Sequence, residues 1–464
     1  MVLDRFEPAH IFRPVRLVAA GQVGSDAACA AVEVSLAGPI TRTGTRVRCG
    51  FTAAGVRLEG WYDGKHTGIE ITTADETPND LRSRRHGKVT GEVTAIAATL
   101  TGRQFTFLTR GPAEESGSGG SGPGRSGPDA GGVWTARAKV HLDDPVDVSD
   151  LTVVHIWDGE DDTSPLDKVT SGPFGQLGLR DLHLVTHADG TPYVRDDLVF
   201  LTATHAGPGF FDTAHCGVWS FDRESFAMEH RGDLWFQREG RDGLAVYGDH
   251  ATHIVRHEER WLVATSTWGD FEKKSIGITL AETDADLLTG DHVLDSAPLS
   301  LRTDRGLPQP VVGVWDPHLT LIDGHWHVAF VAARRFFNFY PVLARACEPG
   351  ALDGFEVVGA ATSRKATEGT IIARLEGEWR VVASDGRENR PENRAEYPVF
   401  DLAMEQVGAL DAPYSSNLPW PSLIPHGDQW LLVTFDGKPY GGPLTGYGTH
   451  GDVVVMATEP TPEA

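Results

Sequence analysis

The chain has few cysteines, few basic residues and no long apolar run, and each shortage excludes a class of protein. Its 464 residues include four cysteines, which form no CxxC pair, so neither a disulfide framework nor a redox motif is expected. Lys and Arg number 41 against 65 Asp and Glu, a net charge of −24, which disfavours nucleic acid and anionic membranes as partners. No apolar run approaches the roughly 18 residues of a membrane span, and no secretory pattern opens the chain. We therefore expect a cytoplasmic protein.

Several catalytic motifs are also missing. The sequence contains neither the Gly-x-Ser-x-Gly elbow of serine hydrolases nor a phosphate-binding Gly-x-x-x-x-Gly-Lys loop. No mixed cysteine–histidine spacing supports a zinc site. We therefore expect no metal and no cofactor.

The chain does contain a recurring sequence pattern. An acidic residue precedes a short apolar run, a polar turn follows, and a second apolar run begins with an aromatic residue, most clearly over 313–332. Copies start at Asp181, Asp249, Asp316, Glu368 and Pro421, which lie 68, 67, 52 and 53 residues apart. Internal periods of this length, each holding several short strands, are typical of propeller blades. The sequence therefore predicts an all-β fold with a five-bladed β-propeller over 149–464.

The first part of the chain, residues 1–148, lacks this repeat. Its segments 32–36, 47–51, 56–61 and 90–96 alternate apolar and polar residues, as strands with one wet face do, so we expect an antiparallel β-sandwich. A Gly/Ser-rich loop at 112–132 has alternating segments on both sides, which favours a hairpin tip over a domain linker. Because the last repeat is short, we also expect an N-terminal strand to complete the last blade and remove its open edge.

The repeat starts carry the candidate chemistry. In a propeller the innermost strands run along one axis, so Asp181, Asp249, Asp316 and Glu368 are expected to converge at one mouth. Crowded, desolvated carboxylates repel one another, which favours a function over simple capping of turns. Several carboxyl groups around a neutral polyhydroxylated substrate suit glycosidic bond cleavage, where one protonates the leaving oxygen and another attacks or activates water.

The order Asp, Asp-Pro, Glu-Gly in the first, third and fourth copies resembles the five-bladed β-propeller glycoside hydrolases, the arabinanase/β-xylosidase group and more distantly the invertase/levanase group. The resemblance implies that Asp181 is the base or nucleophile, that Glu368 is the acid, and that Asp316 tunes the pKa of the acid and orients it. It also suggests a furanoside or pentoside substrate, such as an arabinofuranoside, xyloside or fructoside. Three motifs depart from the family: Leu rather than Pro follows Asp181, Thr rather than Pro follows Gly369, and the second copy has Gly-Asp-His where Trp-Ala-Pro often stands. Asp249 therefore stays a rival for the base.

Further residues near the repeat starts are predicted to bind substrate. Tryptophans would stack on sugar faces, histidines would bond hydroxyls, and paired arginines would hold an anion. These predicted residues are His183, Asp249, His250, Trp268, Trp315, His318, Arg334, Arg335, Asp385 and Trp420.

Two alternatives stay open at this point. A glycoside phosphorylase on the same fold would replace water with phosphate, which Arg334 and Arg335 would favour. A non-catalytic sugar-binding propeller would not need the three carboxylates to face one another, since a fold alone does not confer a function. The sequence does not decide the sugar, the linkage, the stereochemical course or the oligomeric state.

Overall fold

Strands dominate the computed structural model. It describes residues 5–20, 29–40, 45–53, 55–73, 79–81, 86–112, 132–143, 146, 150–159, 164–241, 243–271, 276–416, 418–437, 441–442, 444 and 451–459. Among these residues the only helical turns are two 3₁₀ turns, η1 (Phe211–Thr213) and η2 (Pro391–Asn393). The all-β class is therefore confirmed. No helix in the described part of the chain is long and apolar enough to cross a membrane.

Five sheets follow one another after residue 178, and we number them first to fifth. Each contains a meander of antiparallel strands. The first sheet contains β14 (Leu179–Leu184), β16 (Val194–Arg195), β17 (Leu198–His205), β18 (His215–Phe221), β19 (Met228–Gly240), β20 (Gly243–Tyr247) and β24 (His292–Asp295). The second contains β15 (Thr186–His187), β21 (His250–His257), β22 (Arg260–Ser266), β23 (Ile278–Thr283) and β25 (Ala297–Pro298). The third contains β26 (Leu301–Arg302), β27 (Gly313–Ile322), β28 (His325–Arg335), β29 (Asn338–Ala346) and β30 (Phe355–Ala360).

The fourth and fifth sheets complete the series. The fourth contains β31 (Thr367–Leu375), β32 (Glu378–Asp385), β33 (Pro398–Phe400) and β34 (Gln406–Ala409). The fifth contains β35 (Ser422–His426), β36 (Gln429–Asp436), β37 (Asp452–Thr458) and, from the start of the chain, β1 (Phe6–Phe12). The five sheets correspond in order to the five sequence repeats. The number of blades in a closed ring stays our interpretation of this topology.

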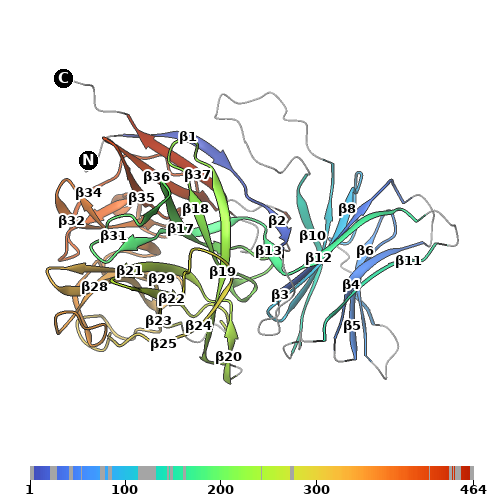
Figure 1. Ribbon diagram of the computed structural model, residues 1–464, viewed down its shortest axis with the longest axis horizontal. Helices are drawn as coiled ribbons and strands as arrows, with labels where there is room; N and C mark the ends of the chain where they lie inside the picture. Colours follow the sequence, from blue (N-terminus) through green and yellow to red (C-terminus); the bar gives the residue numbers. More distant parts are fainter. Residues whose placement is uncertain are drawn as a thin grey trace.

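The N-terminal strand lies where we expected it. β1 runs antiparallel to β37 from Phe6–Thr458 to Phe12–Val453, and the two strands lie together in Figure 1, far from the rest of the N-terminal region. Phe6 is fully buried in a core shared by the fourth and fifth sheets. The first strand of the chain thus covers what would be an open edge of β37.

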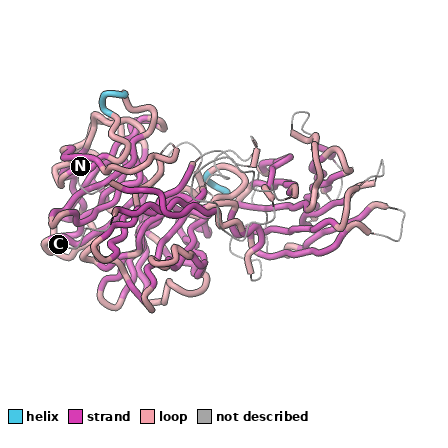
Figure 2. The backbone as a smooth tube through the Cα atoms, turned by 90° about the horizontal axis from the view of Figure 1, so that it is seen from above, coloured by secondary structure: helices cyan, strands magenta, loops and turns pink. Residues whose placement is uncertain are grey.

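Two further five-stranded sheets form the other half of the molecule (Figure 2). The inner N-terminal sheet contains β10 (Trp134–His141), β9 (Gln104–Arg110), β8 (Ala95–Thr101), β3 (Cys29–Leu36) and β12 (Leu166–Gly172). The outer N-terminal sheet contains β11 (Thr152–Trp157), β4 (Val47–Ala53), β5 (Val56–Tyr62), β6 (Thr67–Thr72) and β7 (Asn79–Leu81). The short strands β2 (Arg16–Val18) and β13 (Phe174–Gln176) pair with each other.

The two N-terminal sheets share one apolar core. Phe105 and Phe107 from the inner sheet and Phe51 and Leu58 from the outer sheet belong to the same buried cluster. The opposite face of the inner sheet is also covered, because Ala31 and its neighbours pack with β2, β13 and Trp235 of the first sheet. The central strands β8 and β9 of the inner sheet are therefore buried on both faces.

Strand pairing corrects the division of the chain at residues 148 and 149. β1 belongs to the fifth sheet, whereas β11 and β12 pair with β4 and β3 of the N-terminal sheets. The reason is that the outer edges of both N-terminal sheets need partners, and the chain supplies them before it enters the first sheet. The strands on either side of the Gly/Ser-rich stretch pair with each other, with Trp134 of β10 opposite Arg110 of β9, as a hairpin requires. Residues 113–131 themselves lie outside the described residues.

Candidate active site

The first strand of the meander in four of the sheets, which we call the innermost strand, has an irregularity near its first residues. These strands are β14, β21, β27 and β31. Each has a β-bulge against the second strand of its sheet, between Arg180 and His183, His250 and His253, Trp315 and His318, and Glu368 and Ile371. The first residue inside each bulge has a left-handed backbone, with φ of 50° at Asp181, 59° at Ala251, 58° at Asp316 and 68° at Gly369. These four residues are therefore structurally equivalent.

This equivalence corrects the alignment of the repeats. Asp249 precedes the bulge residue Ala251 by two positions, and Glu368 precedes Gly369 by one. Asp249 is fully buried and accepts hydrogen bonds from Arg238 at 2.5 and 2.7 Å and from the backbone N–H of Gly269 at 2.9 Å. A carboxylate held by a bidentate guanidinium has a structural partner already. Asp249 thus forms a buried ion pair with Arg238 and is not equivalent to the carboxylates at the bulges.

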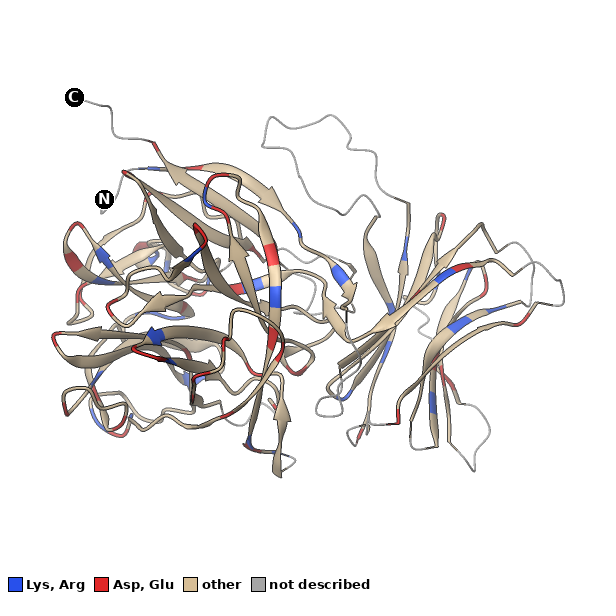
Figure 3. Ribbon diagram, in the orientation of Figure 1, with Lys and Arg blue, Asp and Glu red and all other residues tan. Residues whose placement is uncertain are grey.

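Asp181, Asp316 and Glu368 act on one another electrostatically. Asp181 and Asp316 are buried and Glu368 is partly buried, although many other acidic residues lie in loops (Figure 3). Burial, followed by the charge of Asp181, raises the pKa of Glu368 to about 7. Burial and then the charges of Glu368 and Asp181 raise the pKa of Asp316 well above its usual range. Glu368 and Asp316 therefore bind protons more tightly than isolated carboxyl groups do.

Asp316 also connects the bulges of neighbouring sheets. Its backbone N–H donates to Ser266 Oγ at 2.9 Å, and its carbonyl accepts from Thr370 Oγ1 at 3.1 Å. Its carboxylate Oδ2 lies 3.4 Å from the backbone N–H of Gly369, the residue after Glu368. Asp316 is thus in direct contact with the bulge that carries Glu368, which suits an orienting role.

Arg180 is a residue of this site that the sequence did not reveal. Its Nε lies 3.9 Å from Asp181 Oδ1, and its side chain is almost fully buried against the ring of Phe435. Its charge lowers the pKa of both Glu368 and Asp316, against the effect of burial. Its position directly before a repeat start was the only hint, since the other repeats have no arginine there.

Tryptophans surround Glu368. The side chains of Trp420 and Trp315 lower the pKa of Glu368, against the effect of burial, and so favour its ionised form. Trp420 also packs over the bulge, because a Cβ added to Gly369 would lie 2.3 Å from its ring. Trp315 lies next to Trp268, with ring centroids 5.6 Å apart. Trp420 and Trp315 therefore lie around the bulge of the fourth sheet, and Trp268 lies next to Trp315.

A histidine follows three of the four bulges by two positions. His183, His253 and His318 are buried, and the rings of His253 and His318 stack at 3.7 Å. The backbone N–H groups of Leu319 and Ile372 donate to the Nδ1 atoms of His253 and His318. Burial lowers the pKa of all three rings, to about 4 for His183. This neutral trio replaces the predicted one, because His253 and not His250 is equivalent to His183 and His318.

The remaining candidates contact groups other than the three carboxylates. His250 bonds the carbonyl of Gly248 and lies beside Trp268. The guanidinium of Arg334 lies 5.4 Å from the ring of Tyr340, and Arg335 is exposed. Neither arginine is among the main charges that shift the pKa of Glu368 or Asp316, in contrast to Arg180.

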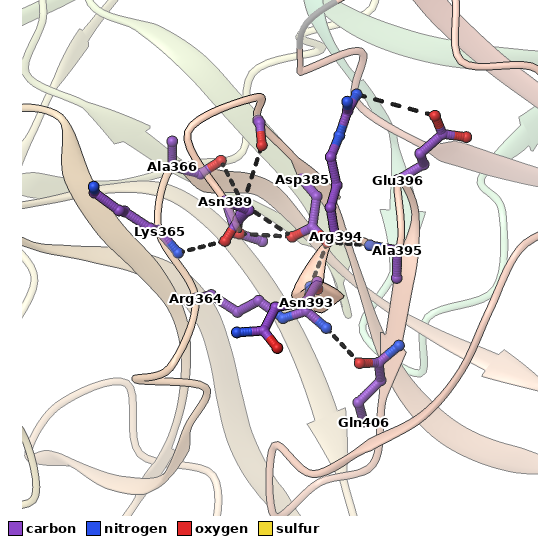
Figure 4. Close-up of polar contacts among 12 residues, drawn as sticks. Arg364, Lys365, Ala366, Asp385, Asn389, Asn393, Arg394, Ala395, Glu396 and Gln406 are labelled. Carbon is purple, nitrogen blue, oxygen red and sulfur yellow. Dashed lines mark hydrogen bonds and ion pairs between the residues drawn. The ribbon is translucent and has the colours of Figure 1, made fainter. Parts of the chain in front are cut away.

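Asp385 is the centre of a buried polar network in the fourth sheet (Figure 4). Its carboxylate accepts from Arg364, from the backbone N–H of Ala395 at 2.8 Å and from Thr367 Oγ1 at 2.7 Å. Asn389 donates to Thr367 Oγ1 at 3.0 Å. The network thus holds the loop after β32 and the residue directly before Glu368, so Asp385 supports the site and does not line it.

A second cluster has the residue types of a metal site. His205 Nδ1, His215 Nε2 and Asp233 Oδ1 lie within 4.8 Å of one another in the first sheet. However, Trp219 Nε1, which can only donate, lies 2.8 Å from His205 Nε2. The neutral ring must therefore carry its proton on Nδ1, the atom that a metal would need. His205 as placed does not fit a metal ion, and it donates toward Asp233 at 3.1 Å instead.

Comparison with known proteins gives likenesses of fold only. No family model matches the chain, and no curated protein matches it. Among solved structures, it resembles inulosucrase from Halalkalicoccus jeotgali bound to kestose, at 12% identity and TM-score 0.46 over 60% of this chain and 84% of that one. It also resembles a GH43_1 enzyme from Xanthomonas citri, at 18% identity and TM-score 0.38 over 59% and 87%. A family 117 glycoside hydrolase from Zobellia galactanivorans matches at 10% identity and TM-score 0.42 over 60% and 84%.

Proposed function

We propose that the chain is a glycoside hydrolase whose acid is Glu368. The observation that carries this proposal is the juxtaposition of Asp181, Asp316 and Glu368 from three sheets, in which burial and the charge of Asp181 raise the pKa of Glu368 to about 7. A carboxyl group with such a pKa is protonated at and below neutral pH, as a general acid must be. A second carboxylate beside it completes the minimum set for glycosidic cleavage.

Each residue has a distinct role in the proposed reaction. Glu368 donates its proton to the leaving oxygen as the glycosidic bond breaks. Asp181, whose Oδ1 lies 3.9 Å from Arg180, attacks the anomeric carbon or removes a proton from the attacking water. Asp316 contacts the Gly369 N–H and keeps the bulge of the acid in place.

A glycoside with a neutral furanose or pentose is the proposed substrate. A neutral sugar adds no charge to a site that already holds three carboxyl groups. The placement of Arg334 against Tyr340 gives phosphorolysis no support from that arginine. Phosphate is nevertheless included in the test below, because Arg180 is a buried cation beside the carboxylates.

Turnover of paired glycosides by wild type and Glu368→Gln tests the proposal. Nitrophenyl and methyl arabinofuranosides, xylosides and fructosides are compared with and without phosphate. Loss of the acid should lower kcat/KM for methyl glycosides by about 10²- to 10⁴-fold, and much less for nitrophenyl glycosides, whose leaving group needs little protonation.

Glu378→Gln is the matched control, because Glu378 is exposed at the start of the neighbouring strand β32. It should keep wild-type rates on both kinds of glycoside. Equal losses in the two variants, or an unchanged Glu368→Gln enzyme, would remove Glu368 as the acid. Turnover that requires phosphate would replace hydrolysis by phosphorolysis.

A further inference from the structure

Five phenylalanines form a continuous aromatic surface, which we term the phenylalanine wall. It consists of Phe210, Phe211, Phe271, Phe336 and Phe337. Neighbouring ring centroids lie 4.3 Å apart for Phe210 and Phe211, 5.3 Å for Phe271 and Phe336, and 4.7 Å for Phe336 and Phe337. Phe337 is 67% exposed and Phe210 38% exposed. Exposed aromatic rings in one group, unlike scattered ones, indicate a binding surface.

The wall lies at the same end of the sheets as the bulges. Its members come from the connections between the second and third strands of the first, second and third sheets. The second strand of each of these sheets ends opposite the first residues of the innermost strand, for example His205 opposite Leu179 and Ala333 opposite Gly313. The connections therefore emerge beside Asp181 and Asp316.

A chain of ring contacts joins the wall to the proposed acid. Phe211 lies 4.3 Å from Trp268, and Trp268 lies 5.6 Å from Trp315, measured between ring centroids. Trp315 in turn interacts with the carboxyl group of Glu368. A group attached to the oxygen that Glu368 protonates thus has apolar surface beside it.

The inner N-terminal sheet supports one end of the wall. Gln104 Nε2 on β9 donates to the carbonyl of Pro208 at 3.0 Å, two residues before Phe210. The approach is close, because a Cβ on Gly209 would lie 2.6 Å from Gln104 Nε2. The N-terminal half of the molecule therefore fixes the segment that carries Phe210 and Phe211.

The same connection in the fourth sheet has the opposite character. Residues 386–397 include three arginines and three glutamates, and Asp385 and Asn389 fix this loop through the network of Figure 4. The connections of three sheets thus carry the phenylalanines and the connection of the fourth carries charged residues, which suits a ligand with one apolar and one polar end.

We propose that the wall binds the leaving group of the substrate, and that this leaving group is an apolar aglycone, either aryl or alkyl. This inference rests on the proposed glycosidase function. Phenylalanine has no hydrogen-bonding group, unlike the Trp and Tyr that combine apolar surface with a polar handle. Five such rings gain free energy from burying apolar surface and offer nothing to the hydroxyl groups of a second sugar.

An alkyl glycoside series tests the wall without changing leaving-group acidity. Methyl, butyl, hexyl and octyl glycosides of the sugar found active should show kcat/KM rising about 2- to 4-fold for each CH₂ that the wall buries. Phe336→Ala and Phe337→Ala should lower the octyl-to-methyl ratio by at least about 10-fold. Val407→Ala, an exposed apolar side chain in the fourth sheet, should keep the wild-type ratio.

A binding measurement separates failure of the wall from failure of the function. Saturation-transfer NMR with phenol should detect binding to wild type and Val407→Ala, and a clear loss in the Phe336→Ala/Phe337→Ala double variant. Phenol binding that is lost in the double variant, in a protein that cleaves no glycoside, would retain the wall and remove the glycosidase. Hydrolysis with a flat alkyl series in wild type would overturn the wall and retain the glycosidase.

Discussion

At the scale of single residues, the proposed acid depends on a balance of opposing effects. Burial is the largest cause of the raised pKa of Glu368, and the charge of Asp181 adds to it. Arg180 acts in the opposite direction, followed by the side chains of Trp420 and Trp315. Because Arg180 also lies beside Asp181, this one cation lowers the repulsion between the two carboxyl groups. It thereby keeps the pKa of the acid near neutrality.

Replacing Arg180 should therefore move the pH profile upward. In Arg180→Met the cation that lowers the pKa of Glu368 is gone, so Glu368 stays protonated to higher pH. We expect the alkaline limb of kcat/KM, near pH 7 in wild type, to rise by up to about 1 pH unit, with a lower maximum rate because Asp181 loses its neighbour. The pH dependence of hydrolysis by both enzymes provides the measurement.

The control for this experiment is Arg260→Met. Arg260 is exposed and paired with Glu282 on the surface of the second sheet, so its loss should leave the limb unchanged. A limb that falls in Arg180→Met, or that moves equally in both variants, would contradict the assigned electrostatics.

At the scale of elements, the shared β-bulge is what brings the site together. A bulge inserts an unpaired residue and turns side chains away from the regular alternation of a strand. In the first and third sheets the inserted residue is the carboxylate itself, and in the fourth it is Gly369, with Glu368 just before it. In the fourth sheet the carboxylate thus lies one residue before the bulge. The proposed acid Glu368 therefore has a different backbone position from Asp181 and Asp316.

Gly369→Ala should damage both stability and activity. The residue has φ of 68°, where a side chain is strained, and its Cβ would lie 2.3 Å from the ring of Trp420. We expect a cost of about 1–3 kcal/mol from strain alone, a further loss from displacing Trp420, and a fall in kcat/KM of at least about 10-fold as Glu368 moves. Thermal unfolding and turnover of the same preparations provide the measurement.

Gly377→Ala separates strain from contact. Gly377 has φ of 83° in the turn of the same sheet, and a Cβ there meets nothing within 4 Å. This variant should lose stability through strain and keep wild-type activity. If the two glycine variants behave alike, the contact between the bulge and Trp420 has no part in holding Glu368.

The bulges also explain what the sequence could and could not predict. The repeats predicted five consecutive sheets and placed Asp181, Asp316 and Glu368 near their starts, because apolar runs and tight turns follow the period of the strands. The inserted residues are Asp, Ala, Asp and Gly, so no common residue type marks the bulge. From the sequence, the second repeat was therefore aligned on Asp249. Alignment on the histidines two positions later would have found Ala251 and His253.

At the scale of the whole molecule, the first and last strands of the chain pair with each other. β1 lies on β37, while β2 and β13 lead into and out of the N-terminal sheets. Both N-terminal sheets are therefore inserted between the first strand of the fifth sheet and the first strand of the first sheet. This connection places the inner N-terminal sheet beside the loop of Phe210, and it makes the fifth sheet depend on residues more than 400 positions apart in sequence.

Phe6→Ala should reveal how strongly the five sheets depend on this closure. Phe6 is fully buried among residues of the fourth and fifth sheets, and its backbone N–H donates to the carbonyl of Asp411 at 2.8 Å. We expect a loss of about 3–5 kcal/mol, whereas Glu7→Ala, exposed on the same strand, should cost little. Removal of residues 1–12 should go further, because the uncovered edge of β37 can pair with another chain. Calorimetry and light scattering would show lower thermal stability and oligomers; a monomeric truncated protein with wild-type stability would show that β1 is dispensable for closure.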